Sequence, residues 1–161
     1  HYGGDGDDES MYRRGTLHFY DNTVVSTREG NTTLFRMATN DATVDARDNI
    51  FYAAAGGETL AVCAGTGNVA LADNWLPEGW VDTHESSVDG TIADDGNVEG
   101  ADPGFAELAS QDFSLGEGSA CIGSGGALAD GVPPVSCMYA VHQGAAERPD
   151  DGSPDLGAFE L

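Results

Sequence analysis

The sequence predicts an all-β protein, a right-handed parallel β-helix of about three to four rungs followed by an irregular C-terminal segment. Three observations indicate this fold. A segment containing Asp-Asn recurs along the chain, apolar residues alternate with polar ones around it, and no stretch has the period of an amphipathic helix. Alternation with a period of two is typical of strands that bury one face. Such units are not stable alone, so they must stack on one another.

Residues 1–15 are expected to form an acidic N-terminal loop or cap. The acidic run in this segment does not match the twelve-residue calcium loop, because Ser10 stands where the turn glycine is required and Thr16 where the bidentate Glu is required. We therefore interpret it as a solvated loop. The run consists of Asp5, Asp7, Asp8 and Glu9.

Residues 16–100 hold the predicted rungs. The segments TLHFYDNTVV (16–25), TVDARDNIFY (43–52) and NVALADNWLP (68–77) align without gaps, so Asn22, Asn49 and Asn74 are separated by 27 and 25 residues. A weaker fourth repeat ends in Asn97. We expect the asparagine side chains to stack in a hydrogen-bonded ladder. The change of phase at each Asp-Asn predicts a bend, with the Asn in the left-handed conformation that it tolerates.

A second pair of strands is predicted between these segments. TTLFRMAT (32–39) and ETLAVCAG (58–65) align with Leu34 beside Leu60, 26 residues apart. Trp75 and Trp80 either offer a sugar-stacking platform or fill the core, and we favour the core because they flank Pro77 and Gly79 at a rung corner.

Residues 101–161 are expected to contain rung remnants and a capping tail. They include DPGF (102–105), DFSL (112–115) and the terminal PDLGAFEL (154–161). With the rungs before them, these motifs resemble the C-terminal part of secreted bacterial β-helix proteins of the pectate-lyase-like superfamily, whose tail reads D-x-G-A-[FY]-E. The resemblance covers residues 12–161. It implies a secreted or cell-surface module, part of a larger lyase- or hydrolase-like protein, that binds or processes polysaccharide.

The three cysteines leave two alternatives. Cys121 and Cys137 lie 16 residues apart and would close a loop worth about 3 kcal/mol as a disulfide. Otherwise all three thiols, with Cys63 in an apolar strand, are buried and reduced.

The candidate catalytic residues lie on the outward face of the first strands. Alternation places His18 beside Asp45 and Tyr20 beside Arg47 on neighbouring rungs. The resemblance to polysaccharide lyases implies β-elimination, in which Arg47 would neutralise the substrate carboxylate and His18 or Tyr20 would act as base or acid. The alternative is a solvated face whose cross-strand pairs contribute up to about 1 kcal/mol each.

A column of carboxylates is predicted at Asp21, Asp48 and Asp73, each just before its ladder asparagine. Stacked carboxylates repel one another, so they must share a cation, fan out to water or accept bonds from bend amides. Ca²⁺ is the cation that would suit this column of oxygen ligands. Binding to water and bend amides is the alternative.

The charge of the chain narrows the classes of partner. The 161 residues include 28 Asp and Glu but only six arginines and no lysine, which gives a net charge of −22. This excludes nucleic acid and anionic membrane surfaces as partners. No apolar run reaches the roughly 18 residues of a membrane span, so no membrane insertion is expected. A surface this acidic suits high salt and suggests a halophilic source.

The same charge bears on the substrate and on an alternative function. A polyanion binds an acidic polysaccharide poorly unless cations intervene, so a neutral glycan or calcium-bridged binding is equally plausible. The alternative function is a non-catalytic structural module. In that reading the open ends of the β-helix stack on another β-helix subunit.

Overall fold

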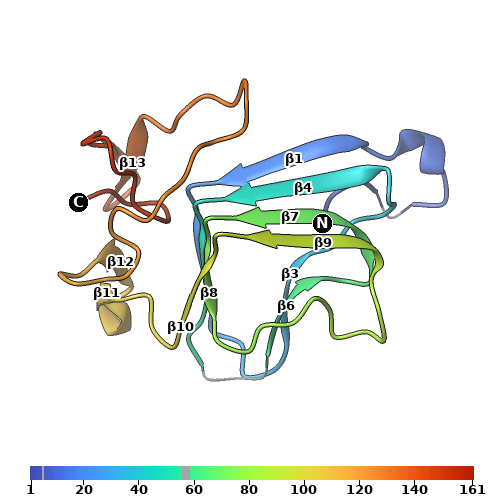
Figure 1. Ribbon diagram of the computed structural model, residues 1–161, viewed down its shortest axis with the longest axis horizontal. Helices are drawn as coiled ribbons and strands as arrows, with labels where there is room; N and C mark the ends of the chain where they lie inside the picture. The colour runs from blue at the N-terminus through green and yellow to red at the C-terminus, as the bar shows by residue number, and fades with distance from the viewer. Residues whose placement is uncertain (5, 56–58) are drawn as a thin grey trace.

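The computed structural model describes residues 1–4, 6–55 and 59–161 (Figure 1). The chain is all-β and forms a parallel β-solenoid of about three turns with antiparallel C-terminal hairpins, which confirms the predicted fold class. Across the described ranges the only helical segments are two short 3₁₀ turns, η1 (Glu9–Met11) and η2 (Leu108–Ser110), and no helix is long and apolar enough to span a membrane.

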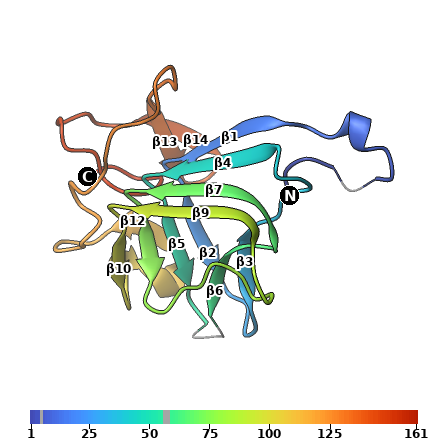
Figure 2. The same ribbon diagram turned by 45° about the vertical axis from the view of Figure 1, so that its right-hand side comes forward.

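Three parallel sheets form the walls of the solenoid (Figures 1 and 2). The first sheet has the order β1 (Gly15–Tyr20), β4 (Ala42–Arg47), β7 (Thr66–Ala72) and β9 (Asp89–Asp95). The second has the order β2 (Thr23–Ser26), β5 (Ile50–Ala53), β8 (Trp75–Pro77) and β10 (Val98–Gly100). The third pairs β3 (Thr32–Phe35) with β6 (Leu60–Cys63), and single parallel bridges extend it at Tyr2–Met37 and Ala61–Val81.

The register of the first sheet is the predicted one, because His18 pairs with Asp45 and Tyr20 with Arg47. The predicted register of the third sheet is wrong by two residues. Thr33 pairs with Ala61 and Phe35 with Cys63, a separation of 28 rather than 26. A shift of two residues keeps every side chain on the same face, so the hydrophobic pattern does not distinguish the two registers.

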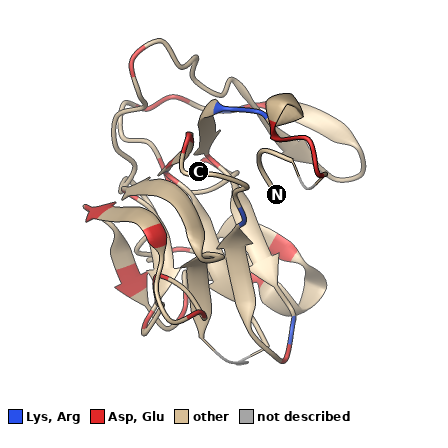
Figure 3. Cartoon of the chain, turned by 90° about the vertical axis from the view of Figure 1, so that its right-hand side faces the viewer, with Lys and Arg blue, Asp and Glu red and all other residues tan. Residues whose placement is uncertain are grey.

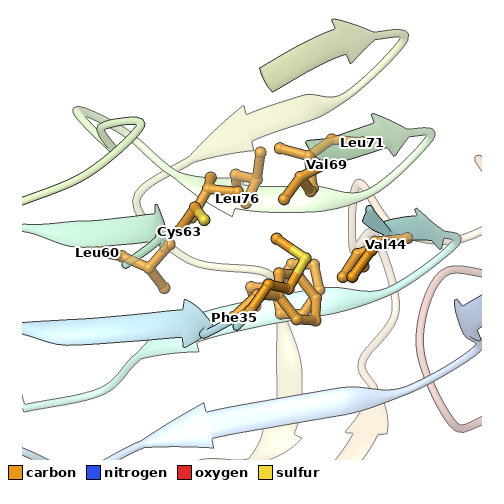
Figure 4. Close-up of a cluster of buried hydrophobic side chains, with 12 residues drawn as sticks. Phe35, Val44, Leu60, Cys63, Val69, Leu71 and Leu76 are labelled. Atoms are coloured by element: carbon orange, nitrogen blue, oxygen red, sulfur yellow. The ribbon is translucent and has the colours of Figure 1, made fainter. Parts of the chain in front are cut away.

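The interior of the solenoid is the main core. Alternate residues of β4 and β7 point inward, and Val44, Ala46, Val69 and Leu71 are at most 2 % exposed. Figure 4 shows the labelled apolar side chains from all three sheets turned toward one another between the strands. Burial of apolar surface stabilises the fold by about 25 cal/mol per Å², so this interior is the principal source of stability.

The predicted asparagine ladder is present and extends to the fourth residue. Asn22 Nδ2 donates to Asn49 Oδ1 and Asn49 Nδ2 to Asn74 Oδ1, both at 2.9 Å, and Asn74 Nδ2 donates to Asn97 Oδ1 at 2.8 Å. Each accepting oxygen also receives the backbone N–H of the asparagine one turn before it.

The residue that turns the chain is not the asparagine. Asp21, Asp48 and Asp73 hold the left-handed conformation, with φ of 53°, 55° and 54°, so the prediction that Asn would adopt it was wrong. At the fourth bend Gly96, with φ of 68°, takes the place of the aspartate. The asparagines are not among the residues with positive φ, and their side chains point along the ladder. Asx residues and glycine are the types that accept positive φ at least cost.

The C-terminal part covers the outer face of the second sheet. It contains the antiparallel pairs β11 (Phe105–Glu107) with β12 (Asp112–Leu115) and β13 (Cys137–Ala140) with β14 (Gly144–Glu147), in a segment expected to be irregular. A second core joins Ile50 of β5 and Trp75 of β8 to the C-terminal part. The tail residues of this core are Leu115, Cys121 and Leu156. Trp75 therefore lies in a core, as predicted, but between sheet and tail rather than inside the solenoid.

The cysteines fit neither alternative in full. Cys121 and Cys137 are both free, so the disulfide is not formed. Cys63 and Cys121 are buried, whereas Cys137 is exposed on β13, a strand at the surface. Burial raises the pKa of the Cys121 thiol to about 11.

Candidate functional site

The first sheet presents a polar group on its outer face, which the C-terminal part leaves open. The Nδ1 atom of His18 lies 3.3 Å from one carboxylate oxygen of Asp45, and the Nε atom of Arg47 donates to the other at 2.7 Å. The Asp45 side chain is 13 % exposed, whereas that of His18 is 41 % exposed. The stacking of β1 on β4 therefore brings together three of the four predicted catalytic residues.

The tail fixes the remaining groups at one end of this face. Tyr20 donates its hydroxyl to the carbonyl of Pro133 at 3.1 Å, and the Nη1 atom of Arg47 donates to the carbonyl of Ala127 at 3.1 Å. Arg47 is thus engaged by both Asp45 and the tail. A guanidinium held this way is poorly placed to neutralise a substrate carboxylate, so His18 is the group best placed to take part in chemistry.

The carboxylates of the predicted metal column each have a protein partner. Asp21 lies 3.5 Å from Nη2 of Arg148, and Asp48 accepts the backbone N–H of Gly126 at 2.7 Å. The Asp73 carboxylate packs so closely on Gly126 that a Cβ at that glycine would overlap it. The column thus serves as the contact line between the bends of the solenoid and the tail.

A cavity of about 360 Å³ opens beside this contact line. Its polar lining includes Asp21, Asp48, Arg148 and Glu160, and its apolar lining comes from tail residues such as Val135. Burial raises the pKa of Asp21 to about 6, against the opposing effect of Arg148, and burial also raises the pKa of Asp48. The carboxylates among the lining residues of the cavity therefore outnumber the arginine, Arg148, that lines it.

No group of three or more His, Cys, Asp or Glu side chains in the described part of the chain is arranged to hold a metal ion. Calcium binding by Asp21, Asp48 and Asp73 stays a prediction. A melting temperature equal in calcium chloride and in a chelator would remove it.

Sequence reasoning missed the residues that lock the tail. Arg148 donates to Glu160 and to the carbonyl oxygens of Asp155 and Gly157, while Glu160 accepts the N–H of Asp155. Asp155 in turn accepts the N–H groups of Gly123 and Leu161. The available signal was the terminal D-x-G-A-F-E motif, whose acidic residues supply both ends of this network. Arg148 had no sequence signal apart from being the last of the six arginines.

The two tryptophans and the N-terminal acidic run are the remaining candidates from the sequence. Trp80 donates its indole N–H to Glu99 at 2.9 Å, and Trp75 is 1 % exposed, so Trp75 has no face free for a sugar. In the N-terminal acidic run Asp8 caps η1 through the N–H of Ser10, while Asp5 lies outside the described residues.

Comparison of the chain with models of protein families, with curated proteins and with solved structures found no match.

Proposed function

We propose that this chain is an extracellular module of the pectate-lyase-like superfamily that binds and processes polysaccharide on the outer face of the β1–β4–β7–β9 sheet. The observation that carries the proposal is the contact between His18 and Asp45 on an open sheet face. Parallel strands give that face a repeat of roughly 4.8 Å, and an extended glycan chain can lie across such a surface. The terminal D-x-G-A-F-E motif supports the superfamily.

The chemistry assigned to His18 follows from its neighbour. A carboxylate beside Nδ1 favours the tautomer with the proton on that nitrogen, which leaves Nε2 as a proton acceptor. Arg47 holds the Asp45 carboxylate in place through the hydrogen bond from its Nε atom. His18 would act as general base, taking a proton from water in hydrolysis or from the sugar carbon in elimination.

The substrate that suits this face is a neutral glycan, or an acidic one bridged by cations. The only arginine of the group, Arg47, is engaged by Asp45 and Ala127, and the chain carries a net charge of −22. The negative charge of the chain would repel an acidic polysaccharide, and among the described residues the polar group on this face has no free cation to offset that repulsion.

The test is activity on a panel of neutral and acidic glycans, read as new reducing ends and as the absorbance of unsaturated products. His18→Gln should lower turnover by roughly a hundredfold or more and leave glycan affinity nearly unchanged, because it removes a base and little contact area. Thr91→Ala, on the same face but on β9, is the matched control and should keep full turnover. Full activity in His18→Gln, or no binding to any glycan, would contradict the proposal.

A further inference from the structure

The N-terminal end of the solenoid differs from its middle. Leu17, Phe19 and Val24 point inward from the first turn but are only partly buried, whereas their counterparts in the second turn are fully covered. With Leu34, Phe35 and Phe51 they form the apolar part of a groove of about 250 Å³, whose remaining lining is His1, Tyr2, Thr32, Thr33 and Arg36. In Figures 1 and 2, β1 forms the outermost strand of the first sheet at this end.

The hydrogen bonds of the asparagine ladder all run in one direction, from each turn to the next. The ladder starts at this same N-terminal end of the solenoid. Asn49, Asn74 and Asn97 each accept two hydrogen bonds through Oδ1 from the asparagine one turn earlier. Within the described residues, Asn22 Oδ1 receives no such pair. Asn22 Oδ1 is therefore the equivalent, in the first turn, of the acceptor oxygens that join the later turns to one another.

Tyr2 shows how a turn in front of the first one is placed. Its N–H donates to the carbonyl of Arg36 at 2.8 Å, and its carbonyl accepts the N–H of Ala38 at 3.1 Å, in a parallel bridge. Tyr2 thus takes the third-sheet position of a preceding turn. The matching positions beside β1 and β2 have no strand among the described residues. Of the three strand positions of that preceding turn, the described residues therefore occupy the third-sheet position alone.

We propose that this end of the solenoid is a docking surface for one further parallel turn, joined to the chain in front of residue 1. Apolar side chains of that turn would cover Leu17, Phe19 and Val24, and its asparagine would donate to Asn22 Oδ1. The turn would continue the strand that Tyr2 already begins, so docking extends an interface present in the structure.

A second copy stacked head to tail fits this surface less well. Asp94 occupies the last place in the inward column that begins with Phe19, because it pairs with Leu71. Stacking would press the Asp94 carboxylate, which accepts a hydrogen bond from Asn97 but has no ion-pair partner among the described residues, against Phe19, and burial of a charge without an opposite charge is costly. Each copy also carries a net charge of −22. Figure 3 shows acidic segments along the chain with few basic ones to offset them.

The proposal is tested by joining a copy of residues 42–63 directly to His1. This places the copies of Val44, Ala46 and Phe51 over Leu17, Phe19 and Val24, and the copy of Asn49 over Asn22. The urea midpoint should rise, and the fluorescence of anilinonaphthalene sulfonate, a dye for exposed apolar surface, should fall. The matched control carries the same extension with Asn49→Ala and Phe51→Ser within the copy, and should lose most of both effects.

Two further results bear on the proposal. If the extended chain does not fold, a free peptide of residues 42–63 should displace the dye from the unextended chain. The proposal is overturned if neither the extension nor the peptide affects dye binding. It is also overturned if sedimentation shows that unextended chains associate with rising concentration and lose dye binding, because the occupant is then a second copy.

Discussion

Asn49 lies in the middle of the ladder and illustrates how much one side chain connects. It accepts from two atoms of Asn22 and donates to Asn74 and to the carbonyl of Phe19, all across turns. It is fully buried, so removing the amide would take one hydrogen bond from each of these groups, although Asn22 Nδ2 would keep the carbonyl of Tyr20 and Asn74 Oδ1 the backbone N–H of residue 49. Buried polar groups that lose a partner cost more than the bond itself contributed.

Asn49→Ala should therefore lower the free energy of unfolding by about 3 kcal/mol, because the backbone N–H of Asn22 loses its acceptor, at about 1–3 kcal/mol, and three further hydrogen bonds are lost. Urea unfolding followed by circular dichroism measures it. Asn68→Ala, whose amide lies on the outer face of β7, is the control and should cost about 1 kcal/mol or less. Equal losses in the two variants would show that the ladder hydrogen bonds contribute no more to the free energy of unfolding than a hydrogen bond on the outer face.

Asp21 predicts a pH dependence of stability. Burial raises its pKa from 3.8 to about 6, so the native state keeps a proton that the unfolded state releases between these values. This contribution is complete below the unfolded pKa and is lost as the pH rises through the folded pKa. Asp21→Asn should gain stability relative to the native chain as the pH rises from about 4 to about 7.

The measurement is the urea midpoint of both proteins across that pH range. Asp95→Asn, an exposed carboxylate on β9, serves as control for the general effect of removing one negative charge. If Asp21→Asn shifts the midpoint by the same amount at every pH, the assignment of the raised pKa to Asp21 is wrong.

At the scale of elements, β5 explains why the tail is needed. Phe51 points into the solenoid, while Ile50 and Tyr52 point outward into the second core with Trp75. A strand that is apolar on both faces requires cover on both, and Leu115, Cys121 and Leu156 of the tail provide it. The outward residues of the first sheet are polar or small, such as His18, Asp45 and Ala70, so this face needs no apolar cover.

Gly157 of the tail packs tightly against residues of the second sheet. Its φ is 89°, and a Cβ there would lie 2.6 Å from Thr23 Oγ1 and 2.8 Å from Ile50 Cδ1. Gly157→Ala should therefore destabilise by roughly 2–4 kcal/mol, through both backbone and contact. Gly152→Ala shares the positive φ of 87° but meets no atom within 4 Å, so it should cost only about 1 kcal/mol. Thermal unfolding of both variants compares the two costs directly.

At the scale of the whole molecule, the net charge of −22 sets the dependence on salt. Mutual repulsion of carboxylates is felt over about 10 Å at 0.1 M salt and about 3 Å at 1 M. The urea midpoint should therefore rise between those concentrations of sodium chloride. An unchanged midpoint would count against a salt-adapted surface. The chloride salt is preferred because sulfate stabilises most proteins by exclusion from their surface.

Much of the fold followed from the repeat. The Asp-Asn spacing predicted the ladder, and alternation predicted both the inward column through Val44 and Val69 and the pairing of His18 with Asp45. The candidate site was predicted less completely from the sequence. Arg47 and Tyr20 are hydrogen-bonded to tail residues more than 75 positions away. Contacts over such separations leave no periodic signal in a single sequence.

The sequence by itself determined which face of the first-sheet strands is buried, because side chains alternate at every residue and apolar residues mark one side. It also determined where the chain bends. Only the tertiary structure decided that Asp rather than Asn takes the left-handed conformation, since both residue types tolerate it. The tertiary structure likewise decided how Arg148 joins Asp21 to the terminal motif, because packing of the tail on the solenoid alone brings those charges together.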